Sequence, residues 1–291
     1  MIPATFEYFA PKTLDEALRL LQTHGDEAKL LAGGHSLLPM MKLRLAAPRF
    51  VVDIGRIKGL NSIRVENGQV VIGAMATHAE VADSEVVRGK CPLLAEVAEH
   101  IGDAQVRNRG TIGGSLAHAD PAADYPAAVL ALDAEITAVG PKGTRKIAAR
   151  DFFVDLLTTQ LGAGEILSEV RVPVQGGGTG SAYAKLAQPA SGFALCGVAA
   201  AVRMNGKRAE QVAVGVTGVS AKAYRAEAVE KALAGAACTE KEIAEAARHA
   251  ADAIDVLGDL HASADYRRQM ASVFAKRAIA AAAARAMGKR A

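Results

Sequence analysis

Apolar residues in the first half of the chain follow two different spacings. They recur at i, i+3, i+4 and i+7 over residues 13–24, which predicts an amphipathic helix that ends at Gly25. Short apolar runs bounded by turn residues predict buried strands instead. The expected strands in this half are residues 29–32, 50–54, 70–74 and 134–139. A further helix is expected over residues 92–101, and Thr77 and Glu80 have the spacing of a helix capping box.

Residues 102–126 interrupt this regular pattern. The segment holds Gly, Asn, Asp and Arg and shows no sustained period. It is too long for a simple turn, so we predict a functional loop here.

The second half of the chain predicts a separate domain. After a strand over residues 165–172, residues 173–180 contain four glycines and a proline, which is the best linker in the chain. Paired strands are expected over residues 193–204 and 211–219, joined by a hairpin turn at Asn205-Gly206. The expected helices are residues 226–233, 239–253 and 264–287. Strands and helices follow each other without regular βαβ alternation, which favours an α+β fold.

Composition limits the classes of function. The 291 residues carry a net charge of +3, no Trp and 4% aromatic residues, which argues against a nucleic-acid binder. The three cysteines are isolated, so the chain lacks the thiolates for an iron–sulfur cluster, a Cys-rich zinc site or a disulfide framework. The first residues do not resemble a signal peptide, and no apolar run approaches about 18 residues. We therefore expect a soluble, cytoplasmic protein.

Two glycine-rich turns are the strongest candidates for a binding site. Residues 32–36 read Ala-Gly-Gly-His-Ser and residues 111–115 read Thr-Ile-Gly-Gly-Ser. Glycines let backbone N–H groups approach an anion, and the hydroxyls add donors, so two such turns could hold a pyrophosphate from both sides. Each turn taken alone also fits an ordinary tight turn. Neither matches the Rossmann or P-loop pattern.

Charged residues flank the second turn. Arg107 or Arg109 could offset phosphate charge, and Asp124 could accept hydrogen bonds from a ribose. A solvated loop surface and local turn capping are the alternatives for these residues. His118 and Asp120 lack a third ligand at a convincing spacing, so we predict no metal site. No nucleophile with a base can be identified, and we assign no catalytic residue.

With these residues in order, the chain resembles a known family. The strings LAGGHSLLPMMKLRLA and AQVRNRGTIGGSLAHADPAADYPA are similar to the FAD-binding medium subunit of molybdenum hydroxylases, of the carbon monoxide dehydrogenase type within the xanthine oxidase/dehydrogenase family. The resemblance implies an α+β fold: a two-subdomain, vanillyl-alcohol-oxidase-like (PCMH-type) FAD-binding domain over residues 1–175. A smaller α+β domain, with a three-stranded sheet plus helices, is implied over residues 176–291.

The resemblance also implies FAD as the cofactor and a set of contacts to it. The two motifs would enclose the pyrophosphate, Asp124 would contact the ribose or adenosine, and Leu161 would make a backbone contact. Lys185 would lie near the isoalloxazine. Phe193 would cover a flavin face without offering the hydroxyl of a tyrosine. The implied FAD-binding residues are Ala32, Gly33, Gly34, His35, Ser36, Leu37, Thr111, Ile112, Gly113, Gly114, Ser115, Asp124, Leu161, Lys185 and Phe193.

Partner subunits are implied as well. Such chains assemble with an iron–sulfur small subunit and a molybdopterin large subunit, typically as a dimer of heterotrimers. Electrons would pass from 2Fe–2S clusters on the partner through FAD to a terminal acceptor. The substrate of the complex stays open among carbon monoxide, aldehydes, purines and N-heterocycles. A stand-alone flavoenzyme of the same fold and a non-catalytic nucleotide-binding module are the alternatives.

Overall fold

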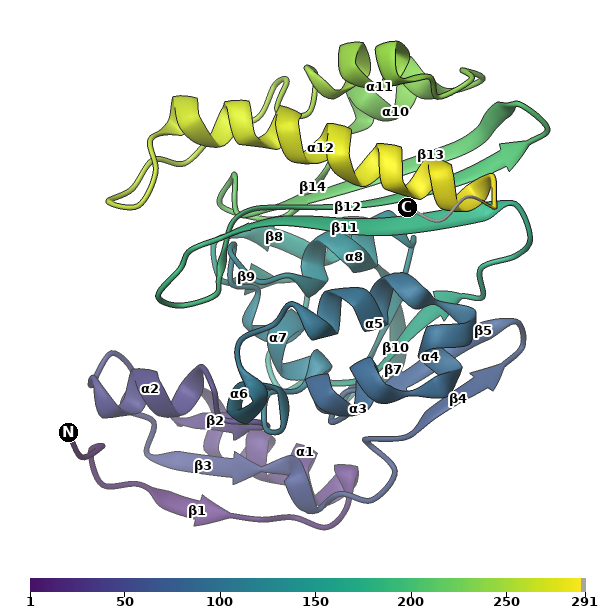
Figure 1. Ribbon diagram of the computed structural model, residues 1–291. Coiled ribbons are helices and arrows are strands. Elements are labelled where there is room, and N and C mark those ends of the chain that lie inside the picture. Colours follow the sequence, from purple (N-terminus) through teal and green to yellow (C-terminus); the bar gives the residue numbers. More distant parts are fainter. Residues whose placement is uncertain (289–291) are drawn as a thin grey trace.

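The structure is a computed structural model that describes residues 1–288, and its helices and strands form three units stacked along one direction (Figure 1). The first unit, purple in Figure 1, consists of β1 (Glu7–Phe9), α1 (Leu14–His24), the 3₁₀ turn η1 (Gly25–Glu27), β2 (Ala28–Leu31), α2 (Leu37–Lys42), β3 (Phe50–Asp53) and the 3₁₀ turn η2 (Ile54–Arg56). Its three strands are parallel, in the order β1-β3-β2. The apolar stripe of α1 is buried in one core with Val52 of the central strand, as its helical spacing predicts.

The second unit is built around a five-stranded antiparallel sheet with the order β4-β5-β10-β6-β7. Its elements are β4 (Ile63–Glu66), β5 (Gln69–Gly73), α3 (His78–Asp83), α4 (Glu85–Lys90), α5 (Pro92–Glu99), α6 (Ala104–Arg107), α7 (Ile112–His118), α8 (Tyr125–Ala131), β6 (Glu135–Gly140), β7 (Gly143–Ala148), α9 (Ala149–Phe152), β8 (Phe153–Asp155), β9 (Thr158–Thr159) and β10 (Ile166–Pro173). A large core joins the sheet to α5 and α8. The short strands β8 and β9 form a separate hairpin.

The third unit is an antiparallel sheet with the order β11-β12-β13-β14. It contains β11 (Thr179–Ala187), β12 (Ala194–Asn205), β13 (Arg208–Thr217), β14 (Tyr224–Arg225), α10 (Glu227–Leu233), α11 (Glu240–Ala247) and α12 (Ala264–Ala286). α12 lies along the outer face of the sheet and α8 lies against the inner face (Figure 1). A Cβ atom at Gly180 would overlap with the carbonyl oxygen of Ala282, and one at Gly215 with that of Ala127. Glycine at these two positions therefore lets helices approach both faces closely.

Most of the long predicted elements are present, with ends shifted by a few residues. The Thr77–Glu80 capping box is confirmed, and the hairpin at Asn205-Gly206 joins β12 to β13. The predicted linker, residues 173–180, spans the connection between β10 and β11, but its first residue and its last two belong to these strands. The helix expected over residues 239–253 ends earlier, as α11.

Two expectations are wrong. The expected loop over residues 102–126 contains α6, α7 and the start of α8. Helices of four to seven residues are too short for an apolar period to show. The C-terminal sheet has four strands instead of three, because the two-residue β14 pairs with β13.

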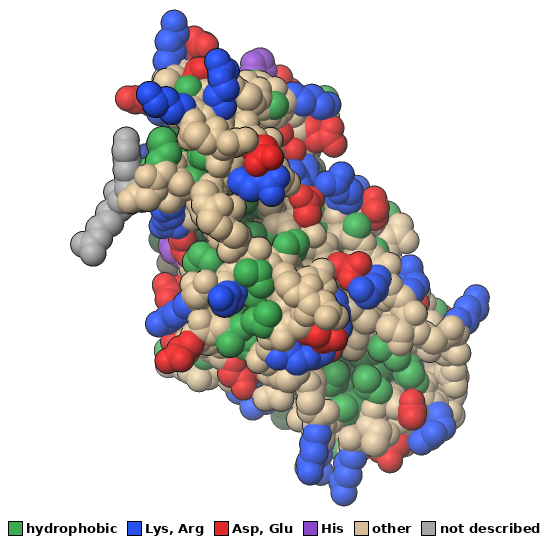
Figure 2. Space-filling view, turned by 90° about the vertical axis from the view of Figure 1, so that its right-hand side faces the viewer, with side chains coloured by type: hydrophobic (Ala, Val, Ile, Leu, Met, Phe, Trp, Pro, Cys, Tyr) green, Lys and Arg blue, Asp and Glu red, His purple; other side chains and the backbone are tan. Residues whose placement is uncertain are grey.

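The expected C-terminal domain includes residues 289–291, which lie outside the described residues. Within residues 1–288, none of the helices has the length and apolarity needed to cross a membrane. Basic and acidic side chains are interspersed over the face shown in Figure 2, in keeping with the small net charge.

Candidate functional site

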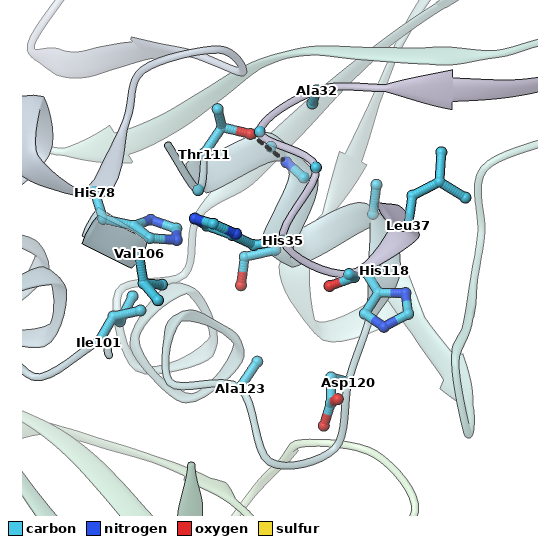
Figure 3. Close-up of a pocket in the computed structure, with 18 of the residues that line it drawn as sticks. Ala32, His35, Leu37, His78, Ile101, Val106, Thr111, His118, Asp120 and Ala123 are labelled. Atoms are coloured by element: carbon cyan, nitrogen blue, oxygen red, sulfur yellow. Dashed lines mark hydrogen bonds between the residues drawn. The ribbon is translucent and has the colours of Figure 1, made fainter. Parts of the chain in front are cut away.

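A pocket of about 600 Å³ lies where the three units meet. Most of its lining residues come from residues 29–40 of the first unit, residues 74–78 and 101–124 of the second, and residues 191–193 before β12. Both glycine turns therefore line the same pocket, as the sequence predicts. Figure 3 shows this pocket, with the turn after β2 and the start of α7 beside each other.

The first glycine turn connects β2 to α2 and has unused hydrogen-bond donors. Within residues 1–288, the backbone N–H groups of Gly33, Gly34 and His35 make no hydrogen bond. Gly34 has a φ of 78°, a conformation that favours glycine. The Ser36 hydroxyl does not cap α2, although the residue stands at its N-cap position. A turn with free N–H groups and a free hydroxyl is suited to hold an anion.

The second glycine turn uses its donors inside the protein. Gly113 N–H donates to the carbonyl oxygen of Ala74 at 2.8 Å, and Gly114 N–H donates to Thr111 Oγ1 at 3.1 Å. A Cβ atom at Gly113 would lie 2.7 Å from that same carbonyl oxygen of Ala74. The glycines here allow close backbone packing, whereas we expected both turns to offer N–H groups. The hydroxyls of Thr111 and Ser115 still belong to residues that line the pocket.

The two turns are in contact with each other. A Cβ atom at Gly33 would overlap with the carbonyl oxygen of Arg109, just before the second turn. An isolated β-bridge joins Thr77 to Thr111 and holds the second turn from its other side. Gly33 is thus required for the junction of the two turns, in addition to any role toward a ligand.

Asp124 lies at the edge of the pocket in a buried polar network. Its carboxylate accepts hydrogen bonds from the Tyr183 hydroxyl at 2.5 Å and from the Lys185 ammonium at 2.9 Å. The Asp124 and Lys185 side chains are only 5% and 3% exposed. Burial raises the pKa of Asp124, and the charge of Lys185 and the two hydrogen bonds oppose this shift. The network joins α8 of the second unit to β11 of the third.

Three of the implied FAD-binding residues do not line the pocket. Ile112 points into the core, and the Lys185 ammonium is engaged by Asp124 and the carbonyl oxygen of His100. Leu161 packs against the core of the second unit, while Leu157 from the same hairpin region lines the pocket. The contacts expected for these three residues stay predictions.

Phe193 stands at the rim of the pocket, and its ring is free to cover a ligand. The residue is 47% exposed. Its carbonyl oxygen accepts from Gln188 N–H at 2.8 Å, which closes the loop before β12. The next residue, Ala194, donates its N–H to Ala122 O in the segment before α8.

Sequence reasoning missed several residues of the pocket. His78, Ile101 and Val106 line it, beside His118 and Asp120, which the sequence had singled out only as candidate metal ligands or charged neighbours of a nucleotide (Figure 3). No local pattern marks the first three, although His78 directly follows the cap at Thr77. Among residues 1–288, no three His, Cys, Asp or Glu residues are grouped so that they could hold a metal ion.

Two known protein families match parts of the chain. Residues 4–175 match the family described as the FAD binding domain in molybdopterin dehydrogenase. The chain belongs to this family. Residues 181–282 match the CO dehydrogenase flavoprotein C-terminal domain. The chain is thus a medium, FAD-binding subunit of the molybdenum hydroxylase type, an oxidoreductase subunit with FAD as its cofactor, and the resemblance seen in the sequence is confirmed.

Individual relatives resemble this FAD-binding subunit over its full length. It is 46% identical to the carbon monoxide dehydrogenase medium chain of Hydrogenophaga pseudoflava, covering 98% of this chain and 99% of that one. It is 37% identical to the 6-hydroxypseudooxynicotine dehydrogenase complex subunit alpha of Paenarthrobacter nicotinovorans, covering 98% and 97%. A solved carbon monoxide dehydrogenase from Hydrogenophaga pseudoflava, lacking the Mo-pyranopterin moiety, has a TM-score of 0.96 at 46% identity and 98% and 99% coverage. The predicted α+β fold class is confirmed by this match.

Proposed function

We propose that this chain is the flavoprotein subunit of a molybdenum hydroxylase complex, in which electrons from 2Fe–2S clusters on a partner subunit pass through FAD to a terminal acceptor. The observation that carries the proposal is the junction of the two glycine turns in one pocket, with the N–H groups of the first turn unused. The family match supports the same reading.

The residues of the pocket fit FAD. The free N–H groups of Gly33, Gly34 and His35 are donors suited to a pyrophosphate, and the hydroxyl of Ser36 adds another. Thr111 and Ser115 offer hydroxyls from the facing turn. When bound, FAD supplies the redox chemistry, and the protein provides orientation and electrostatics.

The other groups of the pocket would orient the cofactor and limit its exposure. Phe193 is placed to cover a planar ring at the rim, where it would exclude water. Asp124 and Lys185 hold the segment before α8 against β11, so that the pocket wall stays fixed. The domain division at residues 175/176 is part of this proposal, with the C-terminal domain supporting the FAD-binding domain.

Partner subunits are required because this chain cannot hold the metal clusters. A 2Fe–2S cluster usually takes four cysteine thiolates, and the chain has three cysteines, all buried and unpaired. We infer from the cysteines that an iron–sulfur cluster lies on a small partner subunit. The likeness to medium subunits adds a molybdopterin large subunit and assembly as a dimer of heterotrimers to the proposal. The isolated cysteines also fit the reducing environment of the cytoplasm.

The molybdenum-bearing partner would determine the substrate of the complex. The two relatives named above are subunits of complexes named for carbon monoxide and for 6-hydroxypseudooxynicotine, although both are similar to this chain over their full length. The substrate of the complex therefore cannot be inferred from similarity between flavin subunits.

The test is to purify the tagged full-length chain from its own cells and to measure the visible spectrum, the released chromophore, iron and molybdenum. Released FAD together with two co-purifying subunits, iron and molybdenum would support the proposal. Released FAD with no partner or metal would favour a stand-alone flavoenzyme instead. A colourless chain that also fails to bind added FAD would favour a non-catalytic nucleotide-binding module.

A further inference from the structure

His78 is bound through its backbone to the second glycine turn. Its N–H donates to the carbonyl oxygen of Gly110 at 2.9 Å, and the neighbouring Thr77 bridges to Thr111. The Thr77–Glu80 capping box begins α3 at this point. The position of His78 beside the pocket is therefore fixed by several contacts.

The protein makes room for the imidazole of His78. A Cβ atom at Gly110 would lie 2.5 Å from His78 Nε2 and 2.8 Å from Cδ2, so a larger residue there would force the ring to shift. On another side the ring is 5.4 Å from the ring of Tyr125, centroid to centroid. The His78 residue is 5% exposed and lines the pocket. Figure 3 shows its ring directed toward His35 across the pocket, with Ile101 and Val106 below it.

Two side-chain polar atoms at this position lack partners. His78 Nδ1 and the Tyr125 hydroxyl are buried and make no hydrogen bond within residues 1–288. A buried donor or acceptor without a partner lowers stability, so native proteins seldom keep one that has no function. Burial, with smaller contributions from the charges of His35 and Arg107, lowers the pKa of His78 to about 4. The ring is thus neutral near pH 7 and carries one donor and one acceptor.

We propose that His78 is a further cofactor-binding residue, which forms a hydrogen bond through its neutral imidazole with one of the two nitrogen heterocycles of FAD. The inference rests on the proposed function, since it needs FAD in this pocket. A neutral ring is poorly suited to a pyrophosphate, which the free N–H groups of the first turn can hold. It is well suited to the ring nitrogens and amino group of adenine, or to the ring nitrogens and carbonyl groups of the isoalloxazine.

A binding role predicts opposite effects on the empty and the loaded protein. Replacing His78 with leucine removes a buried polar atom that has no partner, so the apoprotein should keep or gain thermal stability. The same change removes the hydrogen bond to FAD, so FAD should bind more weakly. A residue that only supports the fold would lower the stability of the apoprotein instead.

The experiment compares His78→Leu, His78→Gln and the control His249→Leu in the full chain. His249 lies on the surface, where its Nδ1 contacts Asp252 at 2.6 Å, and its side chain is 53% exposed. For each protein, the apoprotein melting temperature and the dissociation constants for FAD and ADP are measured, with the absorption spectrum of bound FAD. We expect His78→Leu to raise the FAD dissociation constant roughly five- to tenfold without lowering the apoprotein melting temperature. His78→Gln should recover most of the affinity, and His249→Leu should match the wild type.

The ADP arm distinguishes the two heterocycles. Equal weakening of ADP and FAD binding by His78→Leu would assign the contact to adenine. Weakened FAD binding with unchanged ADP binding and shifted flavin bands would assign it to the isoalloxazine.

Two outcomes would overturn the inference. One is FAD and ADP binding unchanged in His78→Leu, and the other is a lower apoprotein melting temperature with no recovery in His78→Gln. A wild-type chain that binds no FAD would overturn the proposed function itself, and is thus distinguishable from both.

Discussion

The two glycine turns share a Gly-Gly pair and a nearby serine, but their backbone N–H groups are used in opposite ways. In residues 32–36 the N–H groups of both glycines are free, while in residues 111–115 both are bonded within the chain. The first turn thus offers donors, and the second lets two backbones meet at Ala74. A glycine pair can either leave its backbone N–H groups free or allow two backbone segments to pack closely. The sequence of the motif does not distinguish these two roles.

The difference extends to the surroundings of the turns. The first turn belongs to the small three-stranded unit and touches the second through Gly33 and Arg109. The second is followed by Asp124, whose carboxylate is bonded to Tyr183 and Lys185 of β11. We infer that substitutions at Thr111 and in the Asp124 network act first on stability, and that substitution of Ser36 in the first turn acts first on FAD. Substitution of Gly33, where the two turns meet, affects both.

The largest effect is expected for Lys185→Met, which tests how firmly the segment after the second turn is anchored. The change leaves the buried carboxylate of Asp124 without its cation. We expect the free energy of unfolding to fall by about 3–5 kcal/mol, measured by denaturant titration. The double variant Lys185→Met/Asp124→Asn should regain much of this loss, because the buried charge is gone. A loss below about 1 kcal/mol in the single variant would contradict the anchoring role.

Acidification should lower the free energy of unfolding of the wild type more than that of His78→Leu, whose substitution lies beside the second turn. The folded-state pKa of His78 is about 4, below its ordinary value of 6.5. The unfolded chain therefore takes up the proton first, and stability falls as the pH drops from 6.5 toward 4. This contribution reaches about 3 kcal/mol at pH 4 and is absent in the variant. If the unfolding free energies of the two proteins changed in parallel with pH, His78 would make no such contribution.

Gly33→Ala tests the junction of the two turns. Its Cβ atom would overlap with the carbonyl oxygen of Arg109, so the turns must separate. We expect a loss of about 3 kcal/mol in unfolding free energy and loss of FAD, measured by denaturant titration and flavin content. Gly89→Ala is the control, since a Cβ atom there meets nothing within 4 Å. Retained FAD in Gly33→Ala would show that the junction is not needed.

Thr111→Val removes the cap of α7 in the second turn. Thr111 Oγ1 accepts from Gly114 N–H at 3.1 Å. We expect the apoprotein to lose about 1 kcal/mol of stability, as is usual for a lost N-cap. Thr13→Val is the matched control at the cap of α1, where Oγ1 accepts from Glu16 N–H at 3.2 Å. It should lower stability similarly and leave the FAD dissociation constant unchanged.

Ser36→Ala should have the smallest effect on the fold. The hydroxyl makes no capping hydrogen bond, so the apoprotein should unfold within about 0.5 kcal/mol of the wild type. The FAD dissociation constant should rise roughly fivefold, as for one lost hydrogen bond. A destabilised apoprotein with unchanged FAD binding would reverse the contrast between the two turns.

Local sequence patterns predicted the elements that local forces stabilise. The helical spacing of α1, the capping box at Thr77 and the hairpin at Asn205-Gly206 depend on residues a few positions apart. The short helices α6 and α7 and the strand β14 could not be predicted, because their stability comes from contacts with distant parts of the chain. Asp103 and Thr111 cap the starts of α6 and α7, but no apolar period follows either cap.

The candidate site divides in the same way. The sequence by itself determined the family, the two glycine turns and the choice of FAD, because those residues form two continuous strings. Only the tertiary structure decided which N–H groups are free, that Lys185 is engaged by Asp124, and that His78 lies in the pocket. Lys185 and Asp124 are separated by 61 positions, and Gly113 meets Ala74 although the four helices α3 to α6 lie between them in the chain. Which donors stay unpaired depends on such long-range packing, and no local pattern encodes it.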